Sequence, residues 1–321
     1  MNAYGVEVPR MAMRVTDIGS DFQSDVWSEW LLHLRHADDS AFADVVRAEV
    51  ERYADRVLDA ARLSPGMTLA DIGAGEGLIA FRAIDRIGHT LRVFIADVSA
   101  AMLRHAESLA IQRQVQSQCT FVQCPADRLD VFPDASVDVI TTRAVLAYVS
   151  DKGAALREFH RVLKPGGRIS IAEPILQDEA FVATALRTMI DTKSVQPHDR
   201  FLPLLHRWKA AQYPDTHEKI ANSPIANYSE RNLFEFVRRS GFVEIHLELH
   251  IDMLPSIISS WEVFLAGSPH PWAPPLSTVL KQQFTPEERQ LFEQIMRPIV
   301  ESPDAMTTTR IAYLNAVRPH G

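Results

Sequence analysis

Between residues 67 and 174 the chain alternates short apolar runs with helical patterns, and this alternation limits its fold more than any other feature. The first apolar run, MTLADI, begins at Met67, and the last, RISIAEP, ends at Pro174. Strands that alternate with helices predict a parallel sheet wound with helices on both faces. Such a sheet binds its ligand at the carboxyl ends of the strands, near the point where the strand order reverses.

Helical patterns precede and interrupt this alternation. Apolar residues repeat at helical spacing from Trp27 to Leu34 and again from Phe42 to Val57. After Pro174 the alternation pauses twice, with a helix that Ser229 can cap and the strand VEIHLELHID between the pauses, and it ends in TTTRIAYLNAVRP. We therefore expect a helical N-terminal cap (1–62), a core (63–174), an inserted lid (175–228), a continuation of the core (229–253), a helical insertion (254–305) and a last core strand (306–321).

The composition is typical of a folded globular enzyme. The 321 residues are 46% hydrophobic and carry a formal net charge of −8. No basic stripe that could follow a phosphate backbone is present, so nucleic acid is not an expected partner. No apolar run reaches the length of a signal peptide or a membrane span, and we expect a cytoplasmic protein.

The two cysteines, Cys119 and Cys124, both lie in the segment CTFVQC, which alternates like a strand. Their spacing, without a nearby histidine or third cysteine, fits no zinc template, so we expect no metal site. We interpret them as thiols of a strand core, with a redox or metalloid-binding pair as the alternative.

The segment DIGAGEG, residues 71–77, ends the first strand and opens a helix. Glycine loops at a helix N-terminus let a ligand approach the backbone closely, and both dinucleotides and S-adenosylmethionine are bound in this way. The dinucleotide pattern requires a third glycine where Leu78 stands. Asp71 would also repel a pyrophosphate, whereas a zwitterionic methionine group with a cationic sulfonium would tolerate it.

Two further acids follow later strands. Asp97 ends the second strand and can accept hydrogen bonds from both hydroxyls of a ribose. Asp127 follows the third strand in CPADRL, where a carboxylate can accept from the amine of adenine. A helix end then turns through LKPGG, at residues 163–167, into the fifth strand.

Taken in order, DIGAGEG, ADVSAAML, CPAD and LKPGG resemble the motifs of class I S-adenosylmethionine-dependent methyltransferases of the ubiquinone/menaquinone C-methyltransferase type. The resemblance is good over about 67–174 and weak after Ser229. It implies an α/β fold with a Rossmann-like, seven-stranded, mostly parallel sheet, in which the seventh strand lies between the fifth and the sixth. In this chain 254–305 separate the last two strands, which is a departure from the family pattern.

The resemblance implies where S-adenosylmethionine, and its product S-adenosylhomocysteine, would lie. Asp71 faces the methionine part and Asp97 the ribose. The other implied contacts are the backbone of Gly73, Ala74 and Gly75, Val98 and Met102 on the adenine faces, Ala126 and Asp127 at its edge, and Arg143 beside the sulfonium. Local alternatives exist for four of them: Asp71 could cap its own turn, Asp97 could cap the helix after Ser99, Asp127 could be a solvated loop acid, and Met102 occupies a helical core position.

Methyl transfer is an in-line displacement, so the protein mainly aligns the reactants and excludes water, and it needs a general base only for an acceptor that holds a proton of high pKa. Arg143, Tyr148 and Glu173 follow strands and are the catalytic candidates, although a salt bridge for Arg143 and a structural role for Glu173 are equally plausible. Candidates for substrate contacts in the predicted cover are Trp30, His33, His198 and Tyr228, for each of which packing is the alternative.

We expect the acceptor to be a small, partly apolar metabolite, enclosed by 175–228, 254–305 and the helix around Trp27 and Trp30. The same segments could instead bury the interface of a homodimer. Two other classes of function stay open: an NAD(P)-dependent oxidoreductase, which Leu78 and Asp71 disfavour, and a cofactor-binding protein without catalytic activity.

Overall fold

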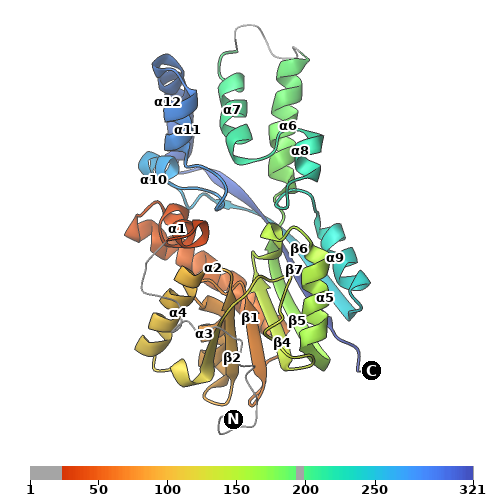
Figure 1. The fold of residues 1–321 in the computed structure, drawn as a ribbon. Coiled ribbons are helices and arrows are strands. Elements are labelled where there is room, and N and C mark those ends of the chain that lie inside the picture. Colours follow the sequence, from red (N-terminus) through yellow and green to blue (C-terminus); the bar gives the residue numbers. More distant parts are fainter. Residues whose placement is uncertain (1–23, 193–198, 321) are drawn as a thin grey trace.

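A mixed seven-stranded sheet, with the order β3-β2-β1-β4-β5-β7-β6, forms the centre of the computed structural model, which describes residues 24–192 and 199–320 (Figure 1). All neighbouring strands are parallel except β7, which runs antiparallel to both β5 and β6. The strands are β1 (Thr68–Ile72), β2 (Arg92–Asp97), β3 (Cys119–Gln123), β4 (Val137–Arg143), β5 (Leu163–Pro174), β6 (Val243–Pro255) and β7 (Met306–Val317). This order confirms the predicted fold class.

The last strand lies between the fifth and the sixth, as the family resemblance implied. Ile171 of β5 pairs with Leu314 of β7, and Leu247 of β6 pairs with the same Leu314 from the other side. The long segment between β6 and β7 therefore does not disturb their pairing. Strand order reverses between β1 and β4, where this fold binds its ligand.

Helices cover both faces of the sheet. One face packs against α2 (Ser40–Ala61), α3 (Leu78–Ile87) and α4 (Ala100–Gln112), and the other packs against α5 (Lys152–Val162) and α9 (Glu230–Arg239). Alternate residues of a strand point to opposite faces, so Leu69 of β1 packs with the first group and Ala70 with the second. Both residues are fully buried, which gives the apolar strands expected of a sheet covered on both sides.

Several predicted helix boundaries are confirmed. Ser99 precedes α4, and its side chain accepts a hydrogen bond from the Met102 N–H at 3.0 Å. Thr285 and Glu288 form the capping box that begins α12 (Pro286–Val300). Each cap satisfies backbone N–H groups that have no partner inside the helix, which is why the sequence marks these positions.

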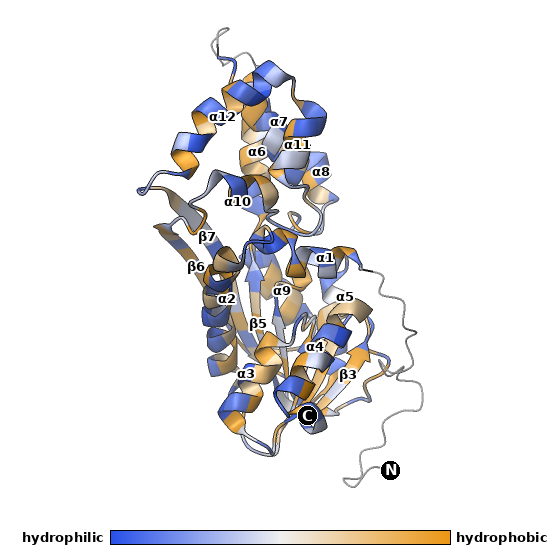
Figure 2. Ribbon diagram, turned by 90° about the vertical axis from the view of Figure 1, so that its left-hand side faces the viewer, coloured by the Kyte–Doolittle hydropathy of each residue, from blue (hydrophilic) through white to orange (hydrophobic). Residues whose placement is uncertain are grey.

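Six helices from the two inserted segments stand together beyond the carboxyl ends of the strands, and we call them the upper helices (Figure 1). They are α6 (Gln177–Asp191), α7 (Leu202–Gln212), α8 (His217–Ala221), α10 (Trp261–Ala266), α11 (Leu276–Gln283) and α12. Trp208 of α7, Trp261 of α10 and Phe292 of α12 share one apolar cluster. Figure 2 shows apolar and polar residues mixed along α12, as expected for a helix that turns one face to such a core.

The described N-terminal part is a short cover over the sheet. Helix α1 (Val26–Leu32) and the 3-10 helix η2 (Leu34–His36) lie beyond the strand ends, between the core and the upper helices (Figure 1). The side chain of Asp25 caps α1 by accepting from the N–H groups of Trp27 and Ser28. Within 24–192 and 199–320, no helix is long and apolar enough to span a membrane.

Candidate active site

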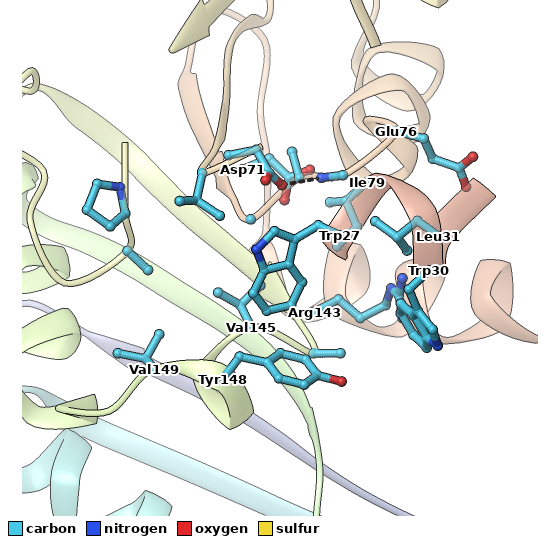
Figure 3. A pocket seen from close by; sticks show the side chains of 18 of the residues that line it. Trp27, Trp30, Leu31, Asp71, Glu76, Ile79, Arg143, Val145, Tyr148 and Val149 are labelled. Atoms are coloured by element: carbon cyan, nitrogen blue, oxygen red, sulfur yellow. Dashed lines mark hydrogen bonds between the residues drawn. The ribbon is translucent and has the colours of Figure 1, made fainter. Parts of the chain in front are cut away.

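A cavity of about 330 Å³ lies at the carboxyl ends of β1, β2 and β4, under α1 (Figure 3). Its floor is the glycine loop between β1 and α3, and its roof carries Trp27, Trp30 and Leu31 of α1. The lining is predominantly apolar, with a few charged groups among aromatic and aliphatic side chains. Such a lining is typical of pockets for small molecules.

The glycine loop can adopt its path only with glycine at key positions. Gly73 has a φ of 65° and Gly75 a φ of 55°, both in the left-handed region that residues with a Cβ atom avoid. A Cβ atom on Gly73 would lie 2.3 Å from Cγ2 of Val145. Gly73, Ala74 and Gly75 thus line the floor of the cavity.

Asp71 is buried at the end of β1 and lines the cavity. Its Oδ1 accepts a hydrogen bond from the hydroxyl of Thr141 at 2.8 Å, while its Oδ2 is buried without a partner in the described part of the chain. Burial raises the pKa of Asp71 to about 7. An unsatisfied carboxylate oxygen in a cavity is suited to a cationic ligand group, such as the ammonium of a methionine moiety.

Asp97 holds the glycine loop against β2. One of its oxygens accepts from the Gly75 N–H and the other from the Ser99 N–H, both at 2.8 Å. Burial raises the pKa of Asp97, and these N–H groups oppose that shift. A carboxylate offers about four acceptor positions, so Asp97 can hold the loop, assist the start of α4 and still accept from a ribose. The local role and the ligand role are therefore compatible.

The predicted adenine contacts do not all lie in the cavity. Val98, Ala126 and Asp127 line it, and Cys124 joins them. Met102 is fully buried and does not line the cavity, so its expected contact with adenine is corrected to a place in the protein interior.

Arg143 and Tyr148 lie across the cavity from the glycine loop. Arg143 ends β4, and its side chain extends toward Trp30 (Figure 3). Tyr148 ends the 3-10 helix η4 (Leu146–Tyr148), and its ring meets Trp27 edge to face at 5.1 Å between centroids. Burial and the nearby charge of Glu173 raise the pKa of Tyr148. Tyr148 therefore stays a neutral phenol, which can donate a hydrogen bond but is a poor base.

Glu173 does not line the cavity, and its candidacy as a catalytic group is corrected. It is fully buried, and its carboxylate accepts from the N–H groups of Val145 and Leu146 at 3.0 Å and of Ala147 at 3.1 Å. These bonds fix the start of η4, because the first N–H groups of a helix have no partner within it. Glu173 therefore positions Tyr148 and does not meet a substrate.

Of the predicted substrate contacts that the structure describes, only Trp30 lines the cavity. His33 is exposed, pairs with Asp38 at 2.7 Å and lies outside the lining. Tyr228 is fully buried and donates its hydroxyl hydrogen to the Pro174 carbonyl at 2.8 Å. Both expectations are therefore corrected, and His198 lies outside the described residues.

The predicted role of the inserted segments is also corrected. No described residue of 175–228 or 254–305 lines the cavity. The upper helices reach it indirectly, since the connection between α10 and α11 carries Trp272, whose ring lies 6.2 Å from Trp27 and 5.3 Å from Tyr148. The helix α1 is the direct cover.

Sequence reasoning missed Arg35, which lines the cavity from η2. It follows Leu31 by four residues, the spacing that puts two side chains on one helical face, and Leu31 also lines the cavity.

Among the described residues, no group of three histidine, cysteine or acidic side chains could hold a metal ion. Both cysteines are free, and burial raises the pKa of each thiol to about 12, which makes both unreactive.

Comparisons with known proteins identify the family of the chain. A family model described as a methyltransferase domain matches residues 63–214. The ubiquinone/menaquinone biosynthesis C-methyltransferase UbiE of Xanthomonas oryzae pv. oryzae is 30% identical over 203 residues, which are 63% of this chain and 76% of that protein. UbiE of Cellvibrio japonicus is 36% identical over 116 residues, 36% of this chain and 46% of the relative. The crystal structure of YcgJ from Bacillus subtilis has a TM-score of 0.53 at 18% identity, covering 84% of this chain and 99% of YcgJ.

Proposed function

Because the chain belongs to the class I S-adenosylmethionine-dependent methyltransferases and has ubiquinone/menaquinone C-methyltransferases among its relatives, we propose that it methylates a small, flat and largely apolar metabolite. One observation carries this proposal: the glycine loop and an aromatic wall enclose a single cavity of about 330 Å³. That volume is at the small end of the range for ligand pockets. An acceptor that shares it with the cofactor must therefore be small.

The residues around the floor fit the cofactor. Oδ2 of Asp71 has no partner among the described residues and would accept from the ammonium of the methionine part. Asp97 retains acceptor positions for the ribose, and Ala126 and Asp127 line the part of the cavity where the adenine would lie. S-adenosylmethionine supplies a methyl group on a cationic sulfur that is already a good leaving group, so these residues need only bind and orient it.

The aromatic wall explains how the acceptor would be held. Trp27 and Tyr148 meet edge to face, and Trp30 lies beside them in the lining (Figure 3). Aromatic side chains bind flat apolar molecules through area and ring geometry, and they exclude water from a displacement at a cationic centre. The neutral phenol of Tyr148 can orient an acceptor oxygen or nitrogen by a hydrogen bond. We propose no general base in the protein: a phenol or quinol would react as its anion, having released its proton to bulk water before the cavity closes, and an aromatic amine would attack with its lone pair and release its proton to water after the transfer.

The acceptor class can be tested with S-adenosylmethionine labelled at its methyl group. We expect transfer to members of a panel of small phenols, quinols and aromatic amines, and none to tRNA or to denatured protein. Trp27→Ala should raise the KM for the acceptor about tenfold, because it removes one to two kcal/mol or so of ring contact. The KM for S-adenosylmethionine should change far less.

His33→Ala is the matched control, since His33 comes from the same N-terminal region but lies outside the cavity lining. It should leave both KM values unchanged. Transfer to tRNA alone, or an acceptor KM that Trp27→Ala does not alter, would show that the aromatic wall is not the acceptor site.

A further inference from the structure

The side of the cavity below η2 carries an arginine, Arg35, whose ion pair with Glu76 is long. The side chain of Arg35 is only 15% exposed. Its Nη2 forms an ion pair with Oε1 of Glu76 at a distance of 3.9 Å. That separation is longer than a hydrogen bond. Glu76 is also shared with Arg47, whose Nη2 lies 3.7 Å from Oε2. One carboxylate at such distances compensates these two guanidinium groups poorly.

A second guanidinium, that of Arg143, also lines the cavity. Arg143 forms no hydrogen bond or ion pair with any residue that the structure describes, although its positive charge acts against the burial that raises the pKa of Asp71. Burial, and after it repulsion by Arg143, lowers the pKa of Arg35 to about 10, so Arg35 is still charged at pH 7. The Nε of Arg35 is buried and also has no partner among the described residues.

A buried donor without an acceptor, such as the Nε of Arg35, costs free energy, and a ligand group that accepts from Arg35 and from the neighbouring Arg143 would lower that cost. The ring of Trp30 lies 5.8 Å from the Arg35 guanidinium and restrains its plane. Guanidinium groups bind carboxylates through two parallel hydrogen bonds, which a compact cation could not reproduce.

We infer that Arg35 and Arg143 together form a carboxylate-binding site at the η2 side of the cavity. The inference rests on the proposed function, because it takes S-adenosylmethionine to occupy the floor formed by the glycine loop. A carboxylate can come from two sources: the α-carboxylate of the cofactor, or an acidic group on the methyl acceptor. In both cases the two arginines select for a negative charge at one side of a predominantly apolar pocket.

The test uses Arg35→Met and Arg143→Met, which remove the charge but keep a side chain of similar length. Arg47→Met is the matched control, since Arg47 shares Glu76 with Arg35 but does not line the cavity. Calorimetry measures the affinity of each protein for S-adenosylhomocysteine and for its decarboxylated analogue. Phenylacetate is then titrated into each protein saturated with S-adenosylhomocysteine.

If the site binds the cofactor, both cavity variants should lose about tenfold or more in affinity for S-adenosylhomocysteine and bind the decarboxylated analogue as the wild type does. If it binds the acceptor, S-adenosylhomocysteine should bind within twofold, and phenylacetate should bind the wild type and the Arg47→Met control but neither cavity variant. In the absence of ligand, the cavity variants should unfold at the same temperature as the wild type or a higher one, because they remove an uncompensated charge.

The inference is overturned if the cavity variants have the same affinity for S-adenosylhomocysteine and the same response to phenylacetate as the wild type. It is also overturned if their affinities for S-adenosylhomocysteine and for its decarboxylated analogue fall equally, because the arginines would then support the shape of the pocket and would not bind a carboxylate. Should Arg35→Met fail to fold, Arg143→Met and Arg35→Lys carry the same comparison. None of these measurements needs turnover, so a protein that shows the site but methylates no member of the aromatic panel counts only against the proposed acceptor class.

Discussion

Cofactor affinity should depend on pH through the ionisation of Asp71. Its pKa of about 7 in the protein without ligand results from burial, which outweighs the hydrogen bond from Thr141. The ionised carboxylate is the form that can accept from the ammonium of S-adenosylhomocysteine, and Oδ2 has no other partner in the described chain. Binding should therefore strengthen as the pH rises through 7.

The size of the effect follows from the pKa. With a pKa of about 7, roughly one molecule in ten is ionised at pH 6 and roughly nine in ten at pH 8, so the apparent affinity should rise about tenfold over that interval.

The stability of the protein without ligand should show the opposite trend. The pKa of Asp71 in the folded protein lies above the value of 3.8 in the unfolded chain. Protonated Asp71 therefore contributes fully to the free energy of unfolding below about pH 4, and this contribution is lost as the pH rises to about 7.

The assay is calorimetry with S-adenosylhomocysteine from pH 5.5 to 8.5, on the wild type, Asp71→Asn and Thr141→Val. Asp71→Asn should bind weakly at every pH and show no titration, because the amide cannot ionise. Thr141→Val removes a hydrogen bond that lowers the pKa, so its titration should have a higher midpoint. An affinity that is constant with pH in the wild type, or equal in Asp71→Asn, would refute the assignment of the ammonium to Asp71.

Three other substitutions test the framework of the site. Asp97→Asn should weaken S-adenosylhomocysteine binding about tenfold in calorimetry and also lower the melting temperature, because an amide cannot accept from both the Gly75 and the Ser99 N–H groups. An unchanged melting temperature would argue against the role of Asp97 in holding the glycine loop. Gly73→Ala should abolish binding, and adding Val145→Ala should restore part of it by removing the 2.3 Å contact, with about 1 kcal/mol of backbone strain remaining. Glu173→Gln should reduce the free energy of unfolding by about 1–3 kcal/mol in urea titrations while cofactor affinity stays within threefold, since Glu173 does not line the cavity.

Local signals in the sequence predicted the fold well. Ser99, Thr285 and Gly77 mark helix starts because caps and positive φ angles depend on a few neighbouring residues. The glycine loop and Asp97 were recognisable for the same reason, since they lie within one strand, one turn and the next strand.

The sequence could not separate groups whose roles depend on distant contacts. Glu173 lies near the end of a strand, as a catalytic acid would. Only the tertiary structure shows that its carboxylate accepts hydrogen bonds from three N–H groups at the start of η4. Likewise, the cover came from the short α1 and not from the long insertions, because packing between segments far apart in the chain decides which one reaches the cavity. Trp272 and Trp27, separated by most of the chain, meet for that reason.

The attachment of α1 has a kinetic consequence. A helix of seven residues is not stable by itself, yet α1 is tied to the connection between α10 and α11 by the hydrogen bond from Trp30 Nε1 to the Ser268 carbonyl at 2.9 Å and by the rings of Trp27 and Trp272. Ligand exchange must therefore either break these ties or displace the upper helices with α1. We therefore expect product release to be slower than the fraying of a free helix.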